Sequence, residues 1–358
     1  MKIIDRYLAK QSIAAILLVS VALLGFDLFF TLVHELKVVG KAQYTLSMAL
    51  NYLLLTAPTR LYAMFPWSAL IGTLISLGAL ANHSELVVLR TAGVSVMRIG
   101  WAVLKGTFIL LVVVLFLGEG IGPVTEKLAQ NMRMSALSSG QTIETSDGWW
   151  LRQGREFIHV QSVKSDQNLL GLTCYQFDEE RRLIRAFFAE KAEKVAEAGE
   201  EWILKNVQGT QFLSNKTKTF HQAEMKMTLV FDTEVLEASM MKHPERLSAA
   251  MLWRTIQNRE QNALNVQTYQ VAFWTKVFQP VVILAMIFLA IPFVFGPLRS
   301  VSMGLRIVVG ILVAFSFHTL SNLFTSLAIV YQFYPLLAVL TPILILLLVA
   351  GWMVKRVR

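Results

Sequence analysis

The chain has 358 residues, of which 55% are hydrophobic and 16% charged, with a formal net charge of +9 and a mean hydropathy of +0.53. About a quarter of the residues of an ordinary soluble domain are charged, so this composition indicates a membrane protein. The single cysteine, Cys174, excludes an internal disulfide. Together with six scattered histidines, it also excludes a cysteine-rich metal site.

Six apolar stretches are long enough to cross a bilayer, since one helical crossing takes about 20 apolar residues. The first stretch runs on to Phe30 and has no small-residue cleavage site after a short core, so it predicts a retained helix and not a removed signal peptide. The stretches cover residues 12–33, 57–81, 101–121, 270–295, 303–328 and 333–354.

The cations beside these stretches predict the orientation of the chain. The cations lie before the first stretch, between the second and third, between the fourth and fifth, and after the sixth, which all fall on one side of the membrane if the chain crosses six times. The 330–334 turn between the fifth and sixth stretches, on the other side, has no charge. We therefore expect both termini in the cytoplasm, and the 34–56 loop, the 122–269 segment and the 330–334 turn outside. The cations are Lys2, Arg6, Lys10, Arg90, Arg98, Arg299, Lys355, Arg356 and Arg358.

Residues 140–237 change to short runs with a period near two, which suggests an antiparallel sandwich or jelly roll. Residues 243–268 regain helical spacing and predict one or two helices that return to the bilayer. Residues 122–262 carry 18 Lys and Arg against 19 Asp and Glu, so the basic excess belongs to the membrane part and argues against a nucleic-acid partner. The predicted strands are 150–163, 170–177, 183–188, 202–208 and 218–231.

The predicted fold is therefore a membrane protein of six transmembrane helices with an all-β, jelly-roll-like insert, placed outside the cytoplasm, between the third and fourth. Residues 1–121 would form the first three helices, 122–269 the β-rich domain with its return helix, and 270–358 the last three helices.

A short helix is predicted between the second and third apolar stretches, near residues 84–95. Ser84 can cap its N-terminus, the Glu85 carboxylate suits the positive end of the helix dipole, and Gly93 can end it. Such a helix is either a coupling helix that docks in a groove of a cytoplasmic ATPase or an ordinary connector at the membrane surface. As a coupling helix it would use Glu85, Leu86, Leu89, Arg90 and Gly93.

Ionisable residues around the end of the first stretch form a candidate substrate site. Lys37 and Lys41 are one turn apart, so we expect them to lie on one helical face. They can bind a phosphorylated head group by charge-assisted hydrogen bonds, or simply extend to the interface. Asp27 lies deeper, where a charge is costly, and so is either functional or faces a polar partner helix.

The sequence lacks the common motifs for nucleotide binding and hydrolysis. It has no G-x-x-x-x-G-K-[ST], no H-E-x-x-H and no G-x-S-x-G. We therefore expect no catalytic residue, metal site or cofactor in this chain, so that a partner must bind and hydrolyse any ATP.

The order of these parts, together with four strings, resembles the LptF/LptG family of lipopolysaccharide-export permeases. The stretch from Phe293 to Arg306 is the most specific and favours the LptG branch. The resemblance covers nearly the whole chain and is weakest in the β insert. The other strings are Asp5-Arg6-Tyr7, Ser84-Glu85-Leu86-Val87-Val88 and Phe278-Gln279-Pro280.

The resemblance implies a permease subunit of an ABC exporter in the inner membrane of a Gram-negative bacterium. Its implied partners are an LptF-like permease, a homodimeric LptB-like ATPase that binds ATP and Mg, and a single-span LptC-like protein. Lipopolysaccharide would be extracted from the inner membrane through gates formed by helices one and five. It would then pass to a row of periplasmic β-jellyrolls that leads towards the outer membrane.

The resemblance also implies which residues touch the substrate. Lys37 and Arg133 match family cations that would meet lipid A phosphates or inner-core sugars, with Lys41 further on. Thr31 and Val38 stand where some relatives have a cation. The phenylalanines of helices one and five would supply an apolar wall, or are plain packing residues: Phe26, Phe29, Phe30, Phe317 and Phe324.

Two other classes of protein remain open. Lipoprotein-releasing and mechanotransmitting ABC subunits use a similar cytoplasmic helix, but they typically have four spans and a larger outside domain near the N-terminus. A structural anchor that presents a β domain would not need six spans.

Overall fold

The computed structural model describes residues 3–41, 43–137, 149–165, 168–180, 182–195, 201–213, 216–229, 244–261, 264–295 and 301–357. The chain forms two compact units. The first, the helical unit, comprises Met1–Arg133, Glu245–Ala250 and Gln267–Arg358. The second, the β unit, comprises Met134–Pro244 and Met251–Val266. Lys2, Arg299 and Arg358, which entered the predicted orientation, lie outside the described residues.

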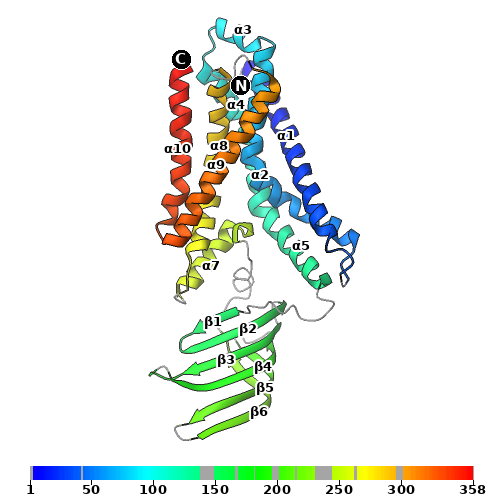
Figure 1. Cartoon of the computed structure of the whole chain (residues 1–358), viewed down its shortest axis with the longest axis vertical. Helices are drawn as coiled ribbons and strands as arrows, with labels where there is room; N and C mark the ends of the chain where they lie inside the picture. Colours follow the sequence, from blue (N-terminus) through cyan, green and yellow to red (C-terminus); the bar gives the residue numbers. More distant parts are fainter. Residues whose placement is uncertain are drawn as a thin grey trace. The chain divides into compact units, whose positions relative to one another are not determined.

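The helical unit contains the predicted membrane helices. Six helices among the described residues are long and apolar enough to cross a membrane, as the sequence predicted. Both termini and the short helix α3 lie at one end of the unit, which we call the α3 end; the opposite end is the far end (Figure 1). The elements are α1 Ile3–Leu36, α2 Leu46–Asn82, α3 Glu85–Thr91, α4 Val96–Phe116, the π-helical turn η1 Leu117–Ile121, α5 Gly122–Leu137, α8 Gln267–Phe295, α9 Met303–Tyr331 and α10 Pro335–Val357.

The first three membrane helices are longer than the apolar stretches predicted. The expected 34–56 loop is wrong, because α1 continues to Leu36 and α2 already begins at Leu46. The third helix does not end near residue 121 but continues through η1 and α5 to Leu137. A search for apolar runs detects only the part of a helix that suits lipid, so it misses polar turns that extend beyond it.

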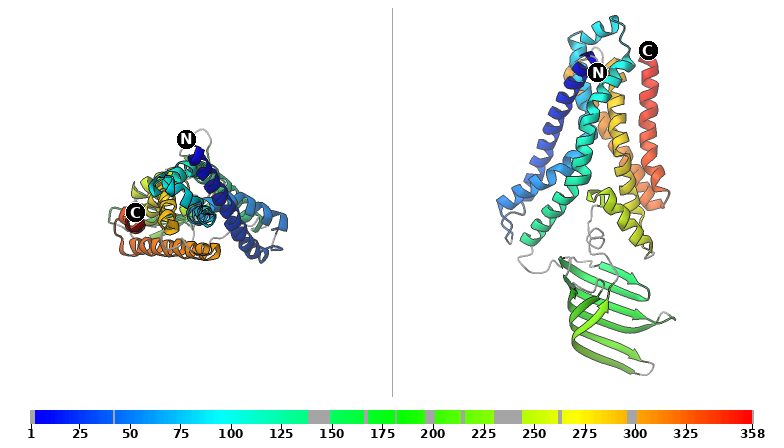
Figure 2. Two further views of the ribbon diagram at one scale, coloured as in Figure 1. Left: turned by 90° about the horizontal axis from the view of Figure 1, so that it is seen from above. Right: turned by 180° about the vertical axis from the view of Figure 1, so that it is seen from behind.

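Small residues allow the helices to pack closely. A Cβ atom at Gly72 of α2 would lie 2.6 Å from the Ile16 Cα atom of α1, and one at Gly106 of α4 would lie 2.8 Å from the Ala9 Cα atom. Such contacts are typical of membrane helices, which gain more from close backbone approach than from burying apolar surface. One side of α1 is therefore held tightly against α2 and α4, as the two views of Figure 2 show.

The β unit is an antiparallel sheet of six strands in sequential order, strongly curved in Figure 2. This confirms the all-β insert; among the described strands every connection joins neighbours, as in a meander, and none is a Greek-key crossover. The run predicted as one strand, 150–163, contains a hairpin at Gly154, whose φ is +61°. The strands are β1 Trp149–Gln153, β2 Glu156–Ser165, β3 Asn168–Phe177, β4 Leu183–Lys194, β5 Glu201–Leu213 and β6 Lys216–Thr228.

One face of the sheet carries the core of the β unit. Ile158, Cys174 and Phe187 are neighbours across β2, β3 and β4, and all three are buried. On β5 both Leu204 and Val207 are buried, because Asn206, with a φ of 54°, interrupts the alternation of the strand between them, while the pairing register with β4 and β6 stays the same on both sides. The return segment, predicted as helical over 243–268, contains the 3-10 turn η2 Pro244–Arg246 and α7 Ala249–Gln261; residues 243, 262 and 263 lie outside the described residues.

Candidate substrate site and coupling helix

The predicted short helix exists as α3, although its N-terminus differs from the prediction. Ser84 has a left-handed conformation (φ 59°) and its side chain makes no capping hydrogen bond, so the predicted Ser84 cap is wrong. Gly93 follows the helix with a φ of +84°, which confirms that a glycine permits the chain to turn there.

The predicted coupling residues differ in their surroundings. Leu86 is buried in the core of the helical unit, and Leu89 packs against its edge. Arg90 lines a cavity of about 320 Å³ between α3 and the end of α8. Glu85 accepts a hydrogen bond of 2.8 Å from the hydroxyl group of Tyr7 on α1, a contact that sequence reasoning missed.

The cations predicted to follow α1 lie in a turn and not on a helix. Because α1 ends at Leu36, the prediction that Lys37 and Lys41 share one helical face is wrong. Gly40, with a φ of +89°, reverses the chain between them. Both side chains are exposed, and neither forms an ion pair with any of the residues that the structure describes. Their charges are therefore open to a ligand.

Arg133 lies near the end of α5 and is already paired. Its Nε atom donates to the Glu35 carboxylate at 3.0 Å, and its guanidinium lies 5.7 Å from the ring centre of Tyr52. Glu35 is buried and also accepts a hydrogen bond of 3.0 Å from the Tyr44 hydroxyl group. Burial and this hydrogen bond raise the pKa of Tyr44 to about 12, so it stays a neutral donor. A glutamate at the end of an apolar helix was the only signal of this cluster in the sequence.

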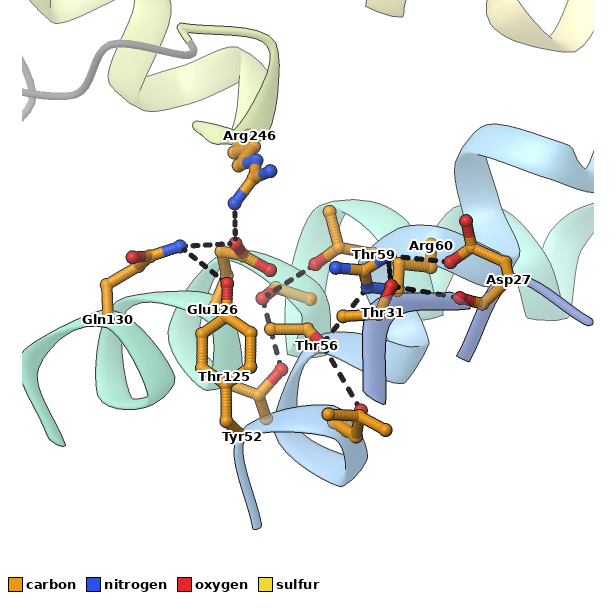
Figure 3. Close-up of polar contacts among 12 residues, drawn as sticks. Asp27, Thr31, Tyr52, Thr56, Thr59, Arg60, Thr125, Glu126, Gln130 and Arg246 are labelled. Carbon is orange, nitrogen blue, oxygen red and sulfur yellow. Dashed lines mark hydrogen bonds and ion pairs between the residues drawn. The ribbon is translucent and has the colours of Figure 1, made fainter. Parts of the chain in front are cut away.

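Asp27 faces a polar partner helix, which was one of the two alternatives. Its carboxylate accepts from Nη1 of Arg60 on α2 at 2.6 Å (Figure 3). The same atom of Arg60 donates to the Thr31 hydroxyl group at 2.7 Å, and its Nε donates to Thr56 at 3.1 Å. This network joins α1 to α2, and nothing in the sequence pattern indicates that Asp27 and Arg60 would pair.

Two further carboxylates hold residues Glu245–Ala250, which belong to the helical unit, against its other helices. Glu126 on α5 accepts from Arg246 at 2.6 Å and from Gln130 at 3.1 Å (Figure 3). Glu119, in the π-helical turn, accepts from Lys276 of α8 at 2.8 Å and from the backbone N–H of Ala249 at 2.7 Å. Sequence reasoning missed both, because the partners are far apart in the chain.

A cavity of about 440 Å³ lies between α2, α8, α9 and α10. Phe317 lines it beside Arg60, Trp67 and polar residues of α9 such as His318 and Asn322. The predicted aromatic wall is therefore divided. Phe26 and Phe30 contact each other at 4.9 Å between ring centres on the exposed side of α1, and they are not among the lining residues.

The arrangement suits an amphiphile with anionic groups. Apolar side chains of α1 and the cavity can contact acyl chains, while Lys37 and Lys41 present uncompensated positive charge at the far end of the helices. Binding and release of such a ligand break no covalent bond, so this task needs no catalytic residue.

Comparisons with known proteins identify the family. The model of the lipopolysaccharide export system permease LptF/LptG family matches residues 6–356. The chain is 32% identical over 355 residues to the lipopolysaccharide export system permease protein LptG of Haemophilus influenzae, covering 99% of each protein. It is 31% identical over 354 residues to LptG of Escherichia coli K12, covering 99% of this chain and 98% of the relative. The match extends over nearly all of the chain and supports lipopolysaccharide export over lipoprotein release. The chain belongs to the LptF/LptG family of lipopolysaccharide export system permeases.

Proposed function

We propose that this lipopolysaccharide export permease receives the phosphorylated head group of its substrate at Lys37 and Lys41, at the far end of α1. The observation that carries the proposal is that both cations are exposed and without an ion-pair partner among the described residues. Charge-assisted hydrogen bonds to phosphate are about twice as strong as neutral ones, so such free cations are the natural contacts for lipid A. Arg133, paired with Glu35, shapes the site and contributes less positive charge.

The permease works as one half of a pair with an LptF-like permease. Two helices support this arrangement, because only 17% of the most apolar part of α1 and 11% of that of α9 is buried, against 72% in α2. Large apolar residues on them, including Phe26, Phe30 and Phe315, are exposed. These are the first and fifth membrane helices, which form the lateral gates in the family. A second permease and an LptC-like helix would cover them while leaving a path for acyl chains.

Transport is driven by a homodimeric LptB-like ATPase that docks on α3, binds ATP with Mg and hydrolyses the ATP. Support comes from the shape of α3, which exposes Val87, Val88 and Arg90 while Leu86 anchors it in the core. In this arrangement the α3 end faces the cytoplasm of a Gram-negative bacterium, and the β unit lies in the periplasm. The excess of positive charge near both termini supports this orientation.

The β unit would stand at the start of the periplasmic β-jellyroll bridge, which carries lipopolysaccharide towards the outer membrane. Its buried face is apolar, with Ile158, Leu172, Phe187 and Leu204, and is therefore chemically suited to acyl chains. Crosslinkers at successive positions of β2 from Glu156 to Val160 should give substrate adducts at one parity only, that of the buried Ile158 and Val160, and adducts at both parities would remove this part of the proposal.

A charge series at Lys37 tests the substrate site. In a reconstituted complex, Lys37→Ala should weaken lipopolysaccharide loading about tenfold, since one charge-assisted hydrogen bond is worth roughly 1.5–3 kcal/mol. Lys37→Glu should be worse because it adds repulsion, and Lys37→Arg should retain most loading. Gln43→Ala, a neutral residue in the same connection, is the matched control. Equal loading by all three Lys37 variants would contradict the assignment.

Partners and orientation are tested separately. Affinity purification from a detergent extract should recover an ATPase and a second six-span permease, and recovery of neither would favour an anchor. Reporters fused at Ser95 should be cytoplasmic and those at Gly154 periplasmic. A cytoplasmic Gly154 reporter would refute the periplasmic role of the β unit.

A further inference from the structure

We infer that Tyr7 and Arg306 are positioning residues for the two gate helices, α1 and α9. Tyr7 links α1 to the coupling helix α3, and Arg306 links α9 to the end of α2, which directly precedes α3. The inference rests on the proposed function, because it assumes that α3 receives the movement of an ATPase. It adds the physical connections through which that movement reaches the helices that must separate for substrate entry.

The first connection joins α1 directly to α3. The Tyr7 hydroxyl group donates to the Glu85 carboxylate at 2.8 Å, across 78 residues of sequence. The next residue in each helix, Leu8 and Leu86, is buried in the same apolar core. The Tyr7–Glu85 hydrogen bond at the surface thus lies beside the buried residues Leu8 and Leu86. Together they fix how the start of α1 is oriented on α3.

Besides this bond, α3 is held by Leu86 in the core of the helical unit and by Leu89 at the edge of that core. Its side towards α8 faces the cavity of about 320 Å³ that Leu86, Val87 and Arg90 line together with Val294 and Phe295 of α8. Ser84, in a left-handed conformation, separates α3 from the end of α2. A short helix with space behind it and a sharp bend before it can change its tilt at little cost in packing. The Tyr7–Glu85 bond would pass that change to α1.

The second connection joins α9 to the last turns of α2. Arg306 lies in the first turn of α9 and its side chain is fully buried. Its Nη1 atom donates to the backbone carbonyl group of Gly78 at 2.6 Å, one turn before α2 ends at Asn82. A buried guanidinium is costly unless its donors are satisfied, so this site tolerates separation of α9 from α2 poorly.

Gly78 is shaped to receive this arginine. A Cβ atom at Gly78 would lie 2.7 Å from Nη1 and 2.8 Å from Cδ of Arg306, closer than real Cβ contacts allow. Even an alanine at this position would therefore displace the guanidinium. By contrast, a Cβ atom at Gly304, two residues before Arg306 on α9, would meet nothing within 4 Å.

The two connections converge on the same bend. Glu85 is the first residue of α3, and Gly78 lies in the final turns of α2, so they flank the bend at Ser84. Movement of this bend would pull on the start of α1 through Tyr7 and on the start of α9 through Arg306. One movement of α3 by the ATPase would then act on both gate helices at once. The bend at Ser84 would be the element with two arrangements that α1 and α9 follow.

The experiment measures lipopolysaccharide transferred per ATP hydrolysed by the full complex in lipid nanodiscs. Tyr7→Phe removes one hydroxyl group from an exposed residue and should leave assembly and ATPase activity near those of the unaltered complex. Transfer per ATP should fall about fivefold, at the low end of couplings between sites because the bond is exposed. Tyr331→Phe, at an exposed tyrosine near the end of α9 at the far end of the unit, is the matched control and should change nothing.

The second connection is tested by Gly78→Ala with Gly304→Ala as its control. Gly78→Ala should lower transfer per ATP, whereas Gly304→Ala should not. If the Gly78→Ala complex fails to assemble, Arg306→Gln decides, because it removes the charge without leaving an unpaired buried cation. Arg306→Lys, which keeps a charged donor, should recover part of the loss.

The outcomes separate this inference from the proposed function. Unchanged transfer per ATP in Tyr7→Phe, or in the assembled Gly78→Ala or Arg306→Gln complex, would overturn the corresponding connection. A fall of ATPase activity and transfer in equal proportion would also overturn it, because it would indicate general damage. An unaltered complex that hydrolyses ATP but moves no lipopolysaccharide would instead refute the proposed function.

Discussion

The ion pair between Arg133 and Glu35 predicts that removing the cation will destabilise the helical unit. Arg133→Met leaves a carboxylate that is 3% exposed without its charged partner, although the Tyr44 hydroxyl group still donates to it. Breaking a buried ion pair from one side costs about 3–5 kcal/mol. Because a quarter of the Arg133 side chain is exposed and Tyr44 remains, we expect a loss of about 2–3 kcal/mol.

The assay is unfolding of the full-length chain in lipid nanodiscs, with lipopolysaccharide binding measured on the same samples. The double variant Arg133→Met/Glu35→Gln should recover most of the stability, because it removes both charges and leaves an acceptor for Tyr44. Lys37→Met, at an exposed and unpaired cation, should change stability by less than about 0.5 kcal/mol while weakening binding. Unchanged stability of Arg133→Met with a loss of binding as large as that of Lys37→Met would refute the reasoning and make Arg133 a direct phosphate contact.

Three more outcomes are expected. Burial raises the pKa of Cys174 to about 12, so iodoacetamide at pH 8 should label it only when the sheet opens, and rapid labelling of the folded chain would contradict its burial. Hydrogen bonds from Lys191 and Lys205 lower the pKa of Glu193 to about 2, so this group stabilises the β unit above its unfolded pKa, and that stabilisation should be lost as pH falls from about 4.5 to 2. Unfolding followed by tryptophan fluorescence at a series of pH values measures this loss, and Glu193→Gln should make the stability depend less on pH. Arg60→Met should cost about 1–3 kcal/mol in thermal unfolding, because its carboxylate partner on α1 would lose its donor; no change would show that the pair contributes nothing.

The membrane helices could be predicted from sequence because their signal is local. Lipid requires about 20 apolar residues in a row, and the chain provides six such runs. The strands were also located well, because alternation along Leu170–Phe177 or Trp202–Gln208 reflects burial on one face. Their exact ends were not, since a hairpin at Gly154 and the left-handed conformation of Asn206 interrupt the period without changing the composition.

The candidate site was less predictable, because it depends on partners distant in sequence. Lys37 was found from its position beside an apolar run, but nothing in the sequence indicated that Arg133 would be paired and Lys37 free. The bond between Tyr7 and Glu85 spans 78 residues, and that between Arg306 and Gly78 spans 228. Residue types alone do not reveal such pairs; they follow from how α1 and α9 pack on α2.

The π-helical turn Leu117–Ile121 places α4 and α5 in different rotational phases along one continuous helix. A turn of this kind holds one residue more than an α-helical turn, and one residue corresponds to about 100° of rotation. Deleting a single residue there would give a more regular helix, yet it would turn Glu126 and Arg133 away from Arg246 and Glu35. The damage would therefore emerge one to four turns from the deletion, so the number of residues in this helix is constrained as strictly as their identity.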